Sequence, residues 1–174
     1  MQKLSDVIGL PVLETASGSQ IGEVQEVVLD YAKRVVTGVI VSEATWFNHD
    51  RGILFQDFVS FEQYAINVHD GKVVRDFSGV LDLVDIYGFQ AIVGKEIYTT
   101  QGNYLGILAD FVFDPSTGHV KLLELSDGMM TDFVYGRMAV PLTSALDVME
   151  NRLIVSERMQ KLLQALNHKP NEVD

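Results

Sequence analysis

Short runs of apolar residues, separated by glycine-rich and acidic turns, follow one another along most of the chain. The run 35–41 is β-branched at every position except Gly38, which predicts a strand that is buried on both faces. Along 20–29 the apolar spacing changes from three to two, which predicts a strand bent by a bulge, with Gly22 at the bend. The remaining apolar runs predict strands over 7–13, 53–55, 59–61, 64–68, 104–113, 120–125, 138–140 and 152–155.

The same pattern of glycines and apolar positions occurs twice in the chain. The offset between the copies is 94 − 9 = 85 at Gly9 and Gly94, and 106 − 22 = 84 at Gly22 and Gly106. The identities that carry the repeat are Gly9/Gly94, Thr15/Thr100, Gly18/Gly102, Gly22/Gly106, Val28/Val112, Asp30/Asp114, Val36/Val120 and Ser42/Ser126. Solenoid repeats run about 20–50 residues, so this longer period is that of a duplicated small domain. We predict two domains, over 1–75 and 92–157, which lean on each other because domains of roughly 80 residues have marginal cores.

Two further segments lie outside the repeats. Residues 76–91 are too apolar for a flexible linker, so we expect a packed connector with a short helix near 79–85. Residues 158–174 are expected to form a C-terminal helix and tail, with Ser156 as the N-cap. The apolar residues at helical spacing are Met159, Leu162, Leu163 and Leu166. This stripe favours a helix that covers a core over one that binds a partner.

The formal net charge of −11 narrows the choice of partners. A field of that sign repels phosphate backbones and anionic lipid surfaces, and the only adjacent basic pair is Lys33-Arg34, so we expect no direct nucleic-acid binding. The chain has no cysteine, which excludes disulfides and thiolate chemistry and fits a cytoplasmic location. No apolar run approaches the roughly 20 residues that span a bilayer, and residues 1–6 lack the build of a signal peptide.

Candidate catalytic and metal-binding residues are sparse. His49 and Asp50 lie near Glu43, but no second histidine stands at ligand spacing, so a solvated loop is the better interpretation. The glycine-rich segment 102–106 lacks the Lys-Ser/Thr pair and the helix of a phosphate-binding loop. No nucleophile elbow occurs either. We therefore predict no catalytic residues, no metal and no cofactor, and a protein that is not an enzyme.

Bulky apolar residues gather in the loop after the central strand of each copy. Such residues in loops often mark contact surfaces. The candidate partner surface consists of Trp46, Phe47, Met129, Met130, Phe133 and Tyr135. The alternative is that these loops seal the barrel ends or the joint between the copies. We expect sealing for Trp46 and exposure for Met129 and Met130.

The repeated residues form one recognisable pattern: a glycine, a turn glycine, an apolar-glycine pair, an Asp-led turn and a β-branched strand. It is found at Gly9, Gly18, Ile21-Gly22, Asp30 and 35–41, and again at Gly94, Gly102, Leu105-Gly106, 114–118 and 120–125. The late triplet Val140-Pro141-Leu142 belongs to the same pattern, whereas the first copy departs from it with Phe55-Gln56-Asp57. The pattern resembles the PRC-barrel family, named for the photosynthetic reaction-centre H subunit and found in the ribosome maturation factor RimM.

This resemblance implies a mostly all-β fold of two tandem small PRC-type β-barrels with a short C-terminal helix. It carries over no catalytic residues and implies an interaction or assembly role. We therefore expect a non-catalytic adaptor module with a protein partner. An RNA-processing or ribosome-assembly factor is the first alternative, which a basic stripe would support. A small-ligand binder between the barrels is the second, which an apolar groove with converging polar groups would support. The sequence leaves homo-oligomerisation open.

Overall fold

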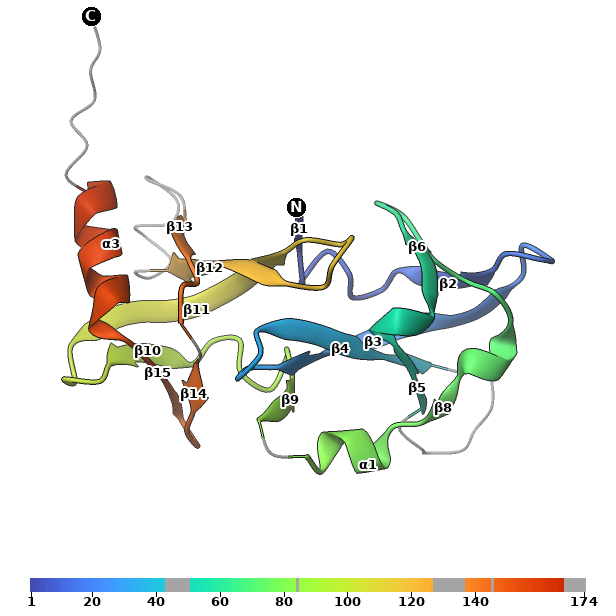
Figure 1. Cartoon of the computed structure of the whole chain (residues 1–174), viewed down its shortest axis with the longest axis horizontal. Helices are drawn as coiled ribbons and strands as arrows, with labels where there is room; N and C mark the ends of the chain where they lie inside the picture. Colours follow the sequence, from blue (N-terminus) through green and yellow to red (C-terminus); the bar gives the residue numbers. More distant parts are fainter. Residues whose placement is uncertain (43–50, 84, 127–136, 145, 168–174) are drawn as a thin grey trace, which may run out of the picture.

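The computed structural model describes residues 1–42, 51–83, 85–126, 137–144 and 146–167, and it arranges them as two curled β-sheets lying end to end (Figure 1). The first sheet contains β2 (Pro11–Glu14), β3 (Gln20–Asp30), β4 (Val35–Ser42), β5 (Arg51–Leu54), β6 (Phe58–Phe61), β7 (Ile66–Val68), β8 (Arg75–Asp76) and β9 (Ile86–Gly88). The second contains β1 (Gln2–Lys3), β10 (Glu96–Thr99), β11 (Tyr104–Phe113), β12 (Val120–Ser126), β13 (Met138–Pro141), β14 (Asp147–Val148) and β15 (Arg152–Val155). The helical elements are η1 (Phe55–Asp57), η2 (Gly71–Val73), α1 (Ser78–Leu81) and α3 (Glu157–Asn167).

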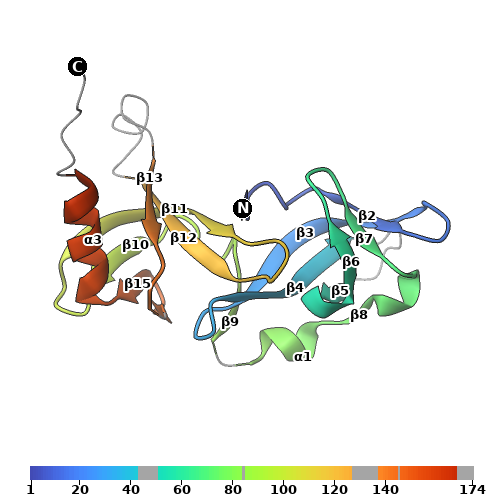
Figure 2. The ribbon, with the colours of Figure 1, turned by 45° about the horizontal axis from the view of Figure 1, so that its top comes forward.

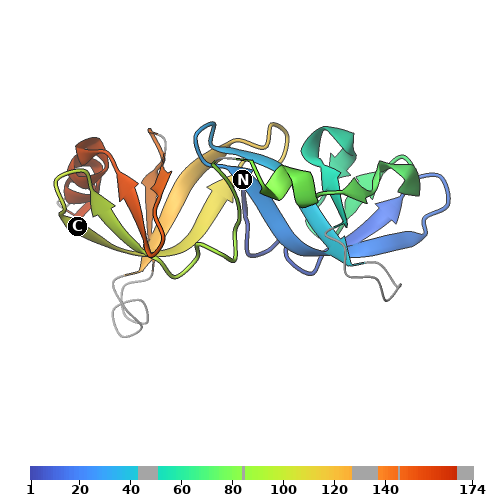
Figure 3. The same cartoon turned by 90° about the horizontal axis from the view of Figure 1, so that it is seen from below.

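The two sheets share one order of strands. In each half a long strand, β3 or β11, pairs antiparallel with the strands before and after it in the chain. The first strand of each half then pairs in parallel with a late one, Val12 beside Ile66 and Ile97 beside Leu153. These pairings curl each sheet towards a barrel (Figure 3). The prediction of a mostly β fold in two tandem copies with a C-terminal helix is confirmed.

The predicted bend near Gly22 is a β-bulge. Val12 pairs with Gly22 and Leu13 with Gln20, which leaves Ile21 as the extra residue. A Cβ atom on Gly22 would lie 2.8 Å from the backbone oxygen of Ser42, so a close approach of two strands requires glycine there. The second half has the same irregularity between β10 and β11.

The halves exchange their leading strands. β1, which precedes the first half, pairs with β11 of the second, and β9, which precedes the second half, pairs with β3 of the first. The two pairings correspond residue by residue: Gln2 lies opposite Phe113, and Tyr87 lies opposite Leu29. The offsets are those of the sequence repeat, 87 − 2 = 85 for the leading strand and 113 − 29 = 84 for its partner. Each sheet therefore includes a short strand that directly precedes, in the chain, the strands of the other sheet.

The joint is closed by reciprocal backbone hydrogen bonds between the β3–β4 and β11–β12 turns. Val36 N–H donates to the Gly118 carbonyl, and Val120 N–H donates to the Arg34 carbonyl. The donor–acceptor distance is 2.9 Å in both bonds. Arg34 and Gly118 both have positive φ, 60° and 73°. Because each bond is the counterpart of the other under the repeat, the halves meet as the two subunits of an isologous dimer do.

One hydrophobic core runs through both halves. Phe111 of β11 lies between Tyr31 and Phe89, with ring centroids 5.9 Å and 6.4 Å away. These three side chains are buried and belong to a cluster that extends from Leu4 to Leu163. The expectation that the halves lean on each other agrees with this shared core.

The segments outside the repeats cover different surfaces. Phe77 is fully buried over β4 and β5, where Gly38 and Gly52 leave space for its ring. The expected connector helix is α1. In α3, Met159 and Leu163 are buried, as predicted for a stripe that covers the core, whereas Leu166 is 42% exposed.

Candidate interaction site at the joint

The loop residues proposed as a partner surface lie outside the described part of the chain. They are Trp46, Phe47, Met129, Met130, Phe133 and Tyr135. Their role stays a prediction.

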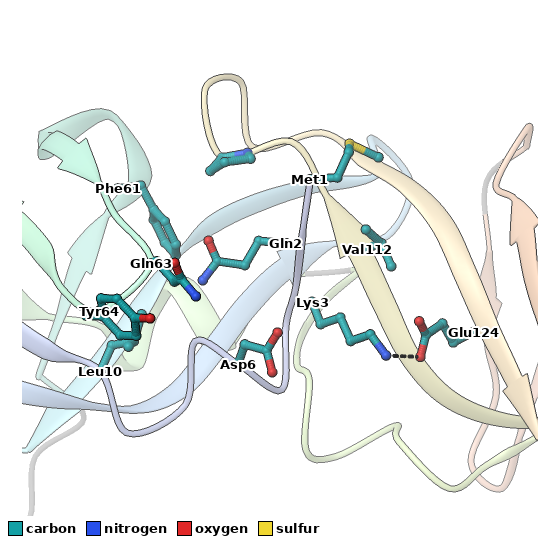
Figure 4. A pocket seen from close by; sticks show the side chains of 11 residues that line it. Met1, Gln2, Lys3, Asp6, Leu10, Phe61, Gln63, Tyr64, Val112 and Glu124 are labelled. Atoms are coloured by element: carbon teal, nitrogen blue, oxygen red, sulfur yellow. Dashed lines mark hydrogen bonds and ion pairs between the residues drawn. The ribbon is translucent and has the colours of Figure 1, made fainter. Parts of the chain in front are cut away.

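A groove of about 990 Å³ lies where the two halves meet, around the N-terminal segment (Figure 4). We call it the joint groove. It is lined by Leu10, Phe61, Gln63 and Tyr64 from the first half, by Val112, Pro115 and Glu124 from the second, and by Met1, Gln2, Lys3 and Asp6. The repeat alone predicts no such site, because the lining residues come from separate stretches of the chain.

The first-half wall of the joint groove is the β6–β7 hairpin. Phe61 packs edge-to-face on Phe113 of the second half, with ring centroids 5.4 Å apart. Phe58 and Phe55 continue this row of rings at 6.2 Å and 5.4 Å. The row anchors the hairpin, so its tip projects from a fixed base. Tyr64 at that tip is 75% exposed.

Polar side chains converge on the space between the walls. Figure 4 shows the amides of Gln2 and Gln63 and the Asp6 carboxylate directed into it. Lys3, the only cationic side chain among the lining residues, is bound at 2.8 Å by the largely buried carboxylate of Glu124. In the described ranges the Asp6 carboxylate forms no ion pair, so this acidic side chain of the groove is unpaired.

Two acids at matching positions, one buried and one half-buried, hold the segments that follow the exchanged strands. Asp110, fully buried, accepts hydrogen bonds from the backbone and hydroxyl of Ser5 at 3.3 Å and 2.5 Å. Its counterpart Glu26 accepts from the Gln90 N–H at 3.2 Å. Burial raises the pKa of Glu26 above its ordinary value, and backbone N–H groups, Gln90 first, oppose that rise. Sequence reasoning missed this pair, although the signal was there: two acids stand at the offset of the repeat (110 − 26 = 84), each directly before apolar residues of a predicted strand.

A second hollow, of about 340 Å³, continues the joint groove along β6. We call it the β6 pocket. It is lined by Phe55, Phe58, Val59, Ser60 and Phe61 on one side and by Pro115 and Ser116 on the other. Phe61 and Pro115 line both hollows, so the two lie next to each other. Figure 2 shows the β11–β12 turn, which carries Pro115, beside β6.

The lining of the groove is a mixture of apolar, amide and charged side chains. Its lining contains no serine, histidine or cysteine, and within the described ranges no three potential metal ligands gather. The described helices are all too short or too polar to cross a lipid bilayer. An apolar wall, a row of amides and one free carboxylate can hold an uncharged or basic ligand by contact and hydrogen bonding.

Comparison with known proteins agrees with the repeated architecture. The family model of the PRC-barrel domain matches residues 1–79 and matches again over residues 85–159. No curated protein matches the chain.

Proposed function

The chain belongs to the PRC-barrel family, with two copies of the domain, and from this premise we propose that it is a non-catalytic protein-interaction module. Its partner binds in the joint groove. The observation that carries the proposal is that both halves and the N-terminal segment together build one groove, with an anchored aromatic wall and an unpaired carboxylate.

The exposure of the rim supports a polypeptide ligand. Small-molecule sites bury about 70–90% of their ligand. Here two side chains at the rim, Met1 and Tyr64, are 69% and 75% exposed. A groove open along its length suits a chain that enters and leaves it. Exposed tyrosines are also common anchors of protein interfaces.

The convergence of Gln2, Gln63 and Asp6 favours a second candidate, a small cationic ligand. Both candidates use the same carboxylate and walls. A polypeptide partner would also contact residues outside the groove, whereas a small cation would not. A photocrosslinking residue at the rim distinguishes the two.

Photocrosslinking tests the proposal. A photoreactive phenylalanine derivative replaces Tyr64 in the full chain, which is then irradiated in cells of its source. The matched control replaces Tyr104, which is 50% exposed on β11 and does not line the joint groove. We expect a discrete protein adduct at position 64 and none at 104. Equal adducts at both positions, or none at 64, would overturn a protein-binding groove.

A further inference from the structure

The edge of β6 is open where the β6 pocket begins. In the described part of the chain β6 pairs with β7 alone. Glu62 N–H donates to the Ala65 carbonyl at 2.9 Å, and hydrogen-bonded and non-bonded pairs alternate along an antiparallel ladder. The peptide groups of the preceding residue, Phe61, therefore face away from β7.

This edge lacks most of the devices that protect sheet edges. Residues 58–61 carry no charge and no proline, and only a bulge at Val59 interrupts them. Val59 is 46% exposed. The equivalent edge in the second half, β14, is two residues long and carries Asp147 where β6 has Ser60 (147 − 60 = 87, as for their partners 154 − 67).

The molecule already completes its sheets with short added strands. β8 adds two residues to β5, β1 adds two to β11 and β9 adds three to β3. Each addition pairs a strand of the sheet with a segment distant in sequence, and β1 and β9 do so on the free side of an inner strand. An addition of two or three residues to β6 would match these in length.

The residues around β6 favour one kind of partner for its open edge. Pro115 and Ser116 bound the β6 pocket on its far side, so the space beside the edge is walled. Neighbouring strands lie about 4.8 Å apart. A single extended chain needs less room beside this edge than the broad sheet edge of a second copy. The free carboxylate of Asp6 and the net charge of −11 favour a basic segment.

We propose that the partner enters the joint groove as one extended basic segment that adds to β6 as a strand, with a lysine or arginine side chain paired to Asp6. This inference rests on the proposed function, since it assigns the binding mode of the same groove. Main-chain hydrogen bonds to β6 supply affinity, and the alternate side chains supply specificity.

The test uses a defined probe, a capped synthetic hexapeptide of alternating valine and lysine, titrated into the full chain and followed by amide NMR. We expect the Phe61 amide to shift and its hydrogen exchange to slow at least tenfold. N-methylation of the peptide's pairing amides should weaken binding at least tenfold. Replacement of its lysines by glutamate should weaken it further.

Matched variants locate the contact. Ser60→Asp copies the second half and should weaken binding at least tenfold, whereas Ser19→Asp, an exposed serine in a turn, should leave it unchanged. Asp6→Asn should weaken binding of the valine-lysine peptide and should leave binding of a valine-threonine analogue unchanged.

Three outcomes overturn strand addition. Binding that ignores N-methylation, or that leaves Phe61 exchange unchanged, shows side-chain contact only; the Tyr64 adduct then still supports the proposed function. A chain that is dimeric by light scattering, with Phe61 already protected and with Ser60→Asp monomeric, assigns the edge to a second copy. Absence of binding by every peptide removes the inference, and the Tyr64 adduct alone then decides the proposed function.

Discussion

The two halves use one strand order but cover their outer faces differently. In the first half Gly38 and Gly52 make room for Phe77, whose ring covers that face. In the second half the corresponding positions are Leu122 (122 − 38 = 84) and Ala139, which carry side chains and are half-buried and exposed, respectively. Repeated core positions thus preserve the barrel. The size of the residue at the two positions held by Gly38 and Gly52 decides whether the ring of a distant residue, Phe77, can cover the outer face of the sheet.

The same comparison holds at the edges of the sheets. β6 is apolar and borders a groove, whereas β14 carries an acid. An acid on a short edge strand is a device that discourages pairing, so the two edges differ in the property on which the proposed strand addition depends.

The largest expected effect comes from Phe77→Ala. The ring is fully buried between two glycines that cannot fill the space, so the loss should be about 3–5 kcal/mol. Leu122, the counterpart of Gly38 on the same face of the second half, is partly exposed, so Leu122→Ala should cost less than half as much. Urea unfolding of both variants measures the difference. Equal losses would contradict the contrast between the two faces.

Leu4→Ala tests the exchanged strands. Leu4 follows β1, is fully buried, and its N–H donates to the Phe111 carbonyl of the other half at 3.0 Å. We expect a loss of about 2–5 kcal/mol. Because the core is shared, unfolding should remain a single transition in calorimetry, as it should for the counterpart Phe89→Ala. Two separate transitions would show that the halves unfold independently.

Tyr31→Phe is expected to stabilise the protein. Tyr31 is buried, and its hydroxyl has no hydrogen-bond partner among the described residues. Burial, followed by the nearby Glu26 charge, raises the pKa of this hydroxyl well above its ordinary value. Removal of an unsatisfied buried hydroxyl should gain about 1 kcal/mol in thermal denaturation. Tyr98→Phe, whose exposed hydroxyl donates to Glu96, is the control; a loss of stability in Tyr31→Phe would show that this hydroxyl has a partner.

Glu26→Gln should change stability least of the four variants, and its effect should depend on pH. The folded state raises the pKa of Glu26 above 4.5, so folding favours its protonated form. This contribution is fully present below pH 4.5 and is lost as pH rises through the raised pKa. Wild type loses this contribution as pH rises, and Glu26→Gln does not. The melting temperature of Glu26→Gln relative to that of wild type should therefore rise from about pH 4 to pH 7. Glu23→Gln, an exposed acid on the same strand, controls for the lost charge. A difference that stays constant with pH would refute the assignment.

Local patterns in the sequence predicted most of the fold. The β-branched run 35–41 is β4, and the predicted turn over 114–118 joins β11 to β12. The prediction of a strand over 7–13 was wrong before Pro11, because residues 4–10 form successive turns that place Leu4 and Val7 in the core. An apolar run is buried by a turn as readily as by a strand.

The candidate site could not be predicted in the same way. The pairing of Lys3 with Val112 joins opposite halves of the chain, and no local period encodes it. The joint groove likewise depends on how Asp6, Tyr64 and Pro115 come together in space. The sequence singled out apolar loops as the partner surface, and those loops lie outside the described residues.

The unequal edges of the two halves set the valency of the molecule. A symmetric pair of open edges on opposite halves would let one chain bridge two neighbours and propagate as a head-to-tail filament. Ser60 on one edge and Asp147 on the other make these two edges unequal, so the proposed strand addition would use β6 and not its counterpart β14. A chain that adds a partner strand at β6 alone would then hold one partner through this edge.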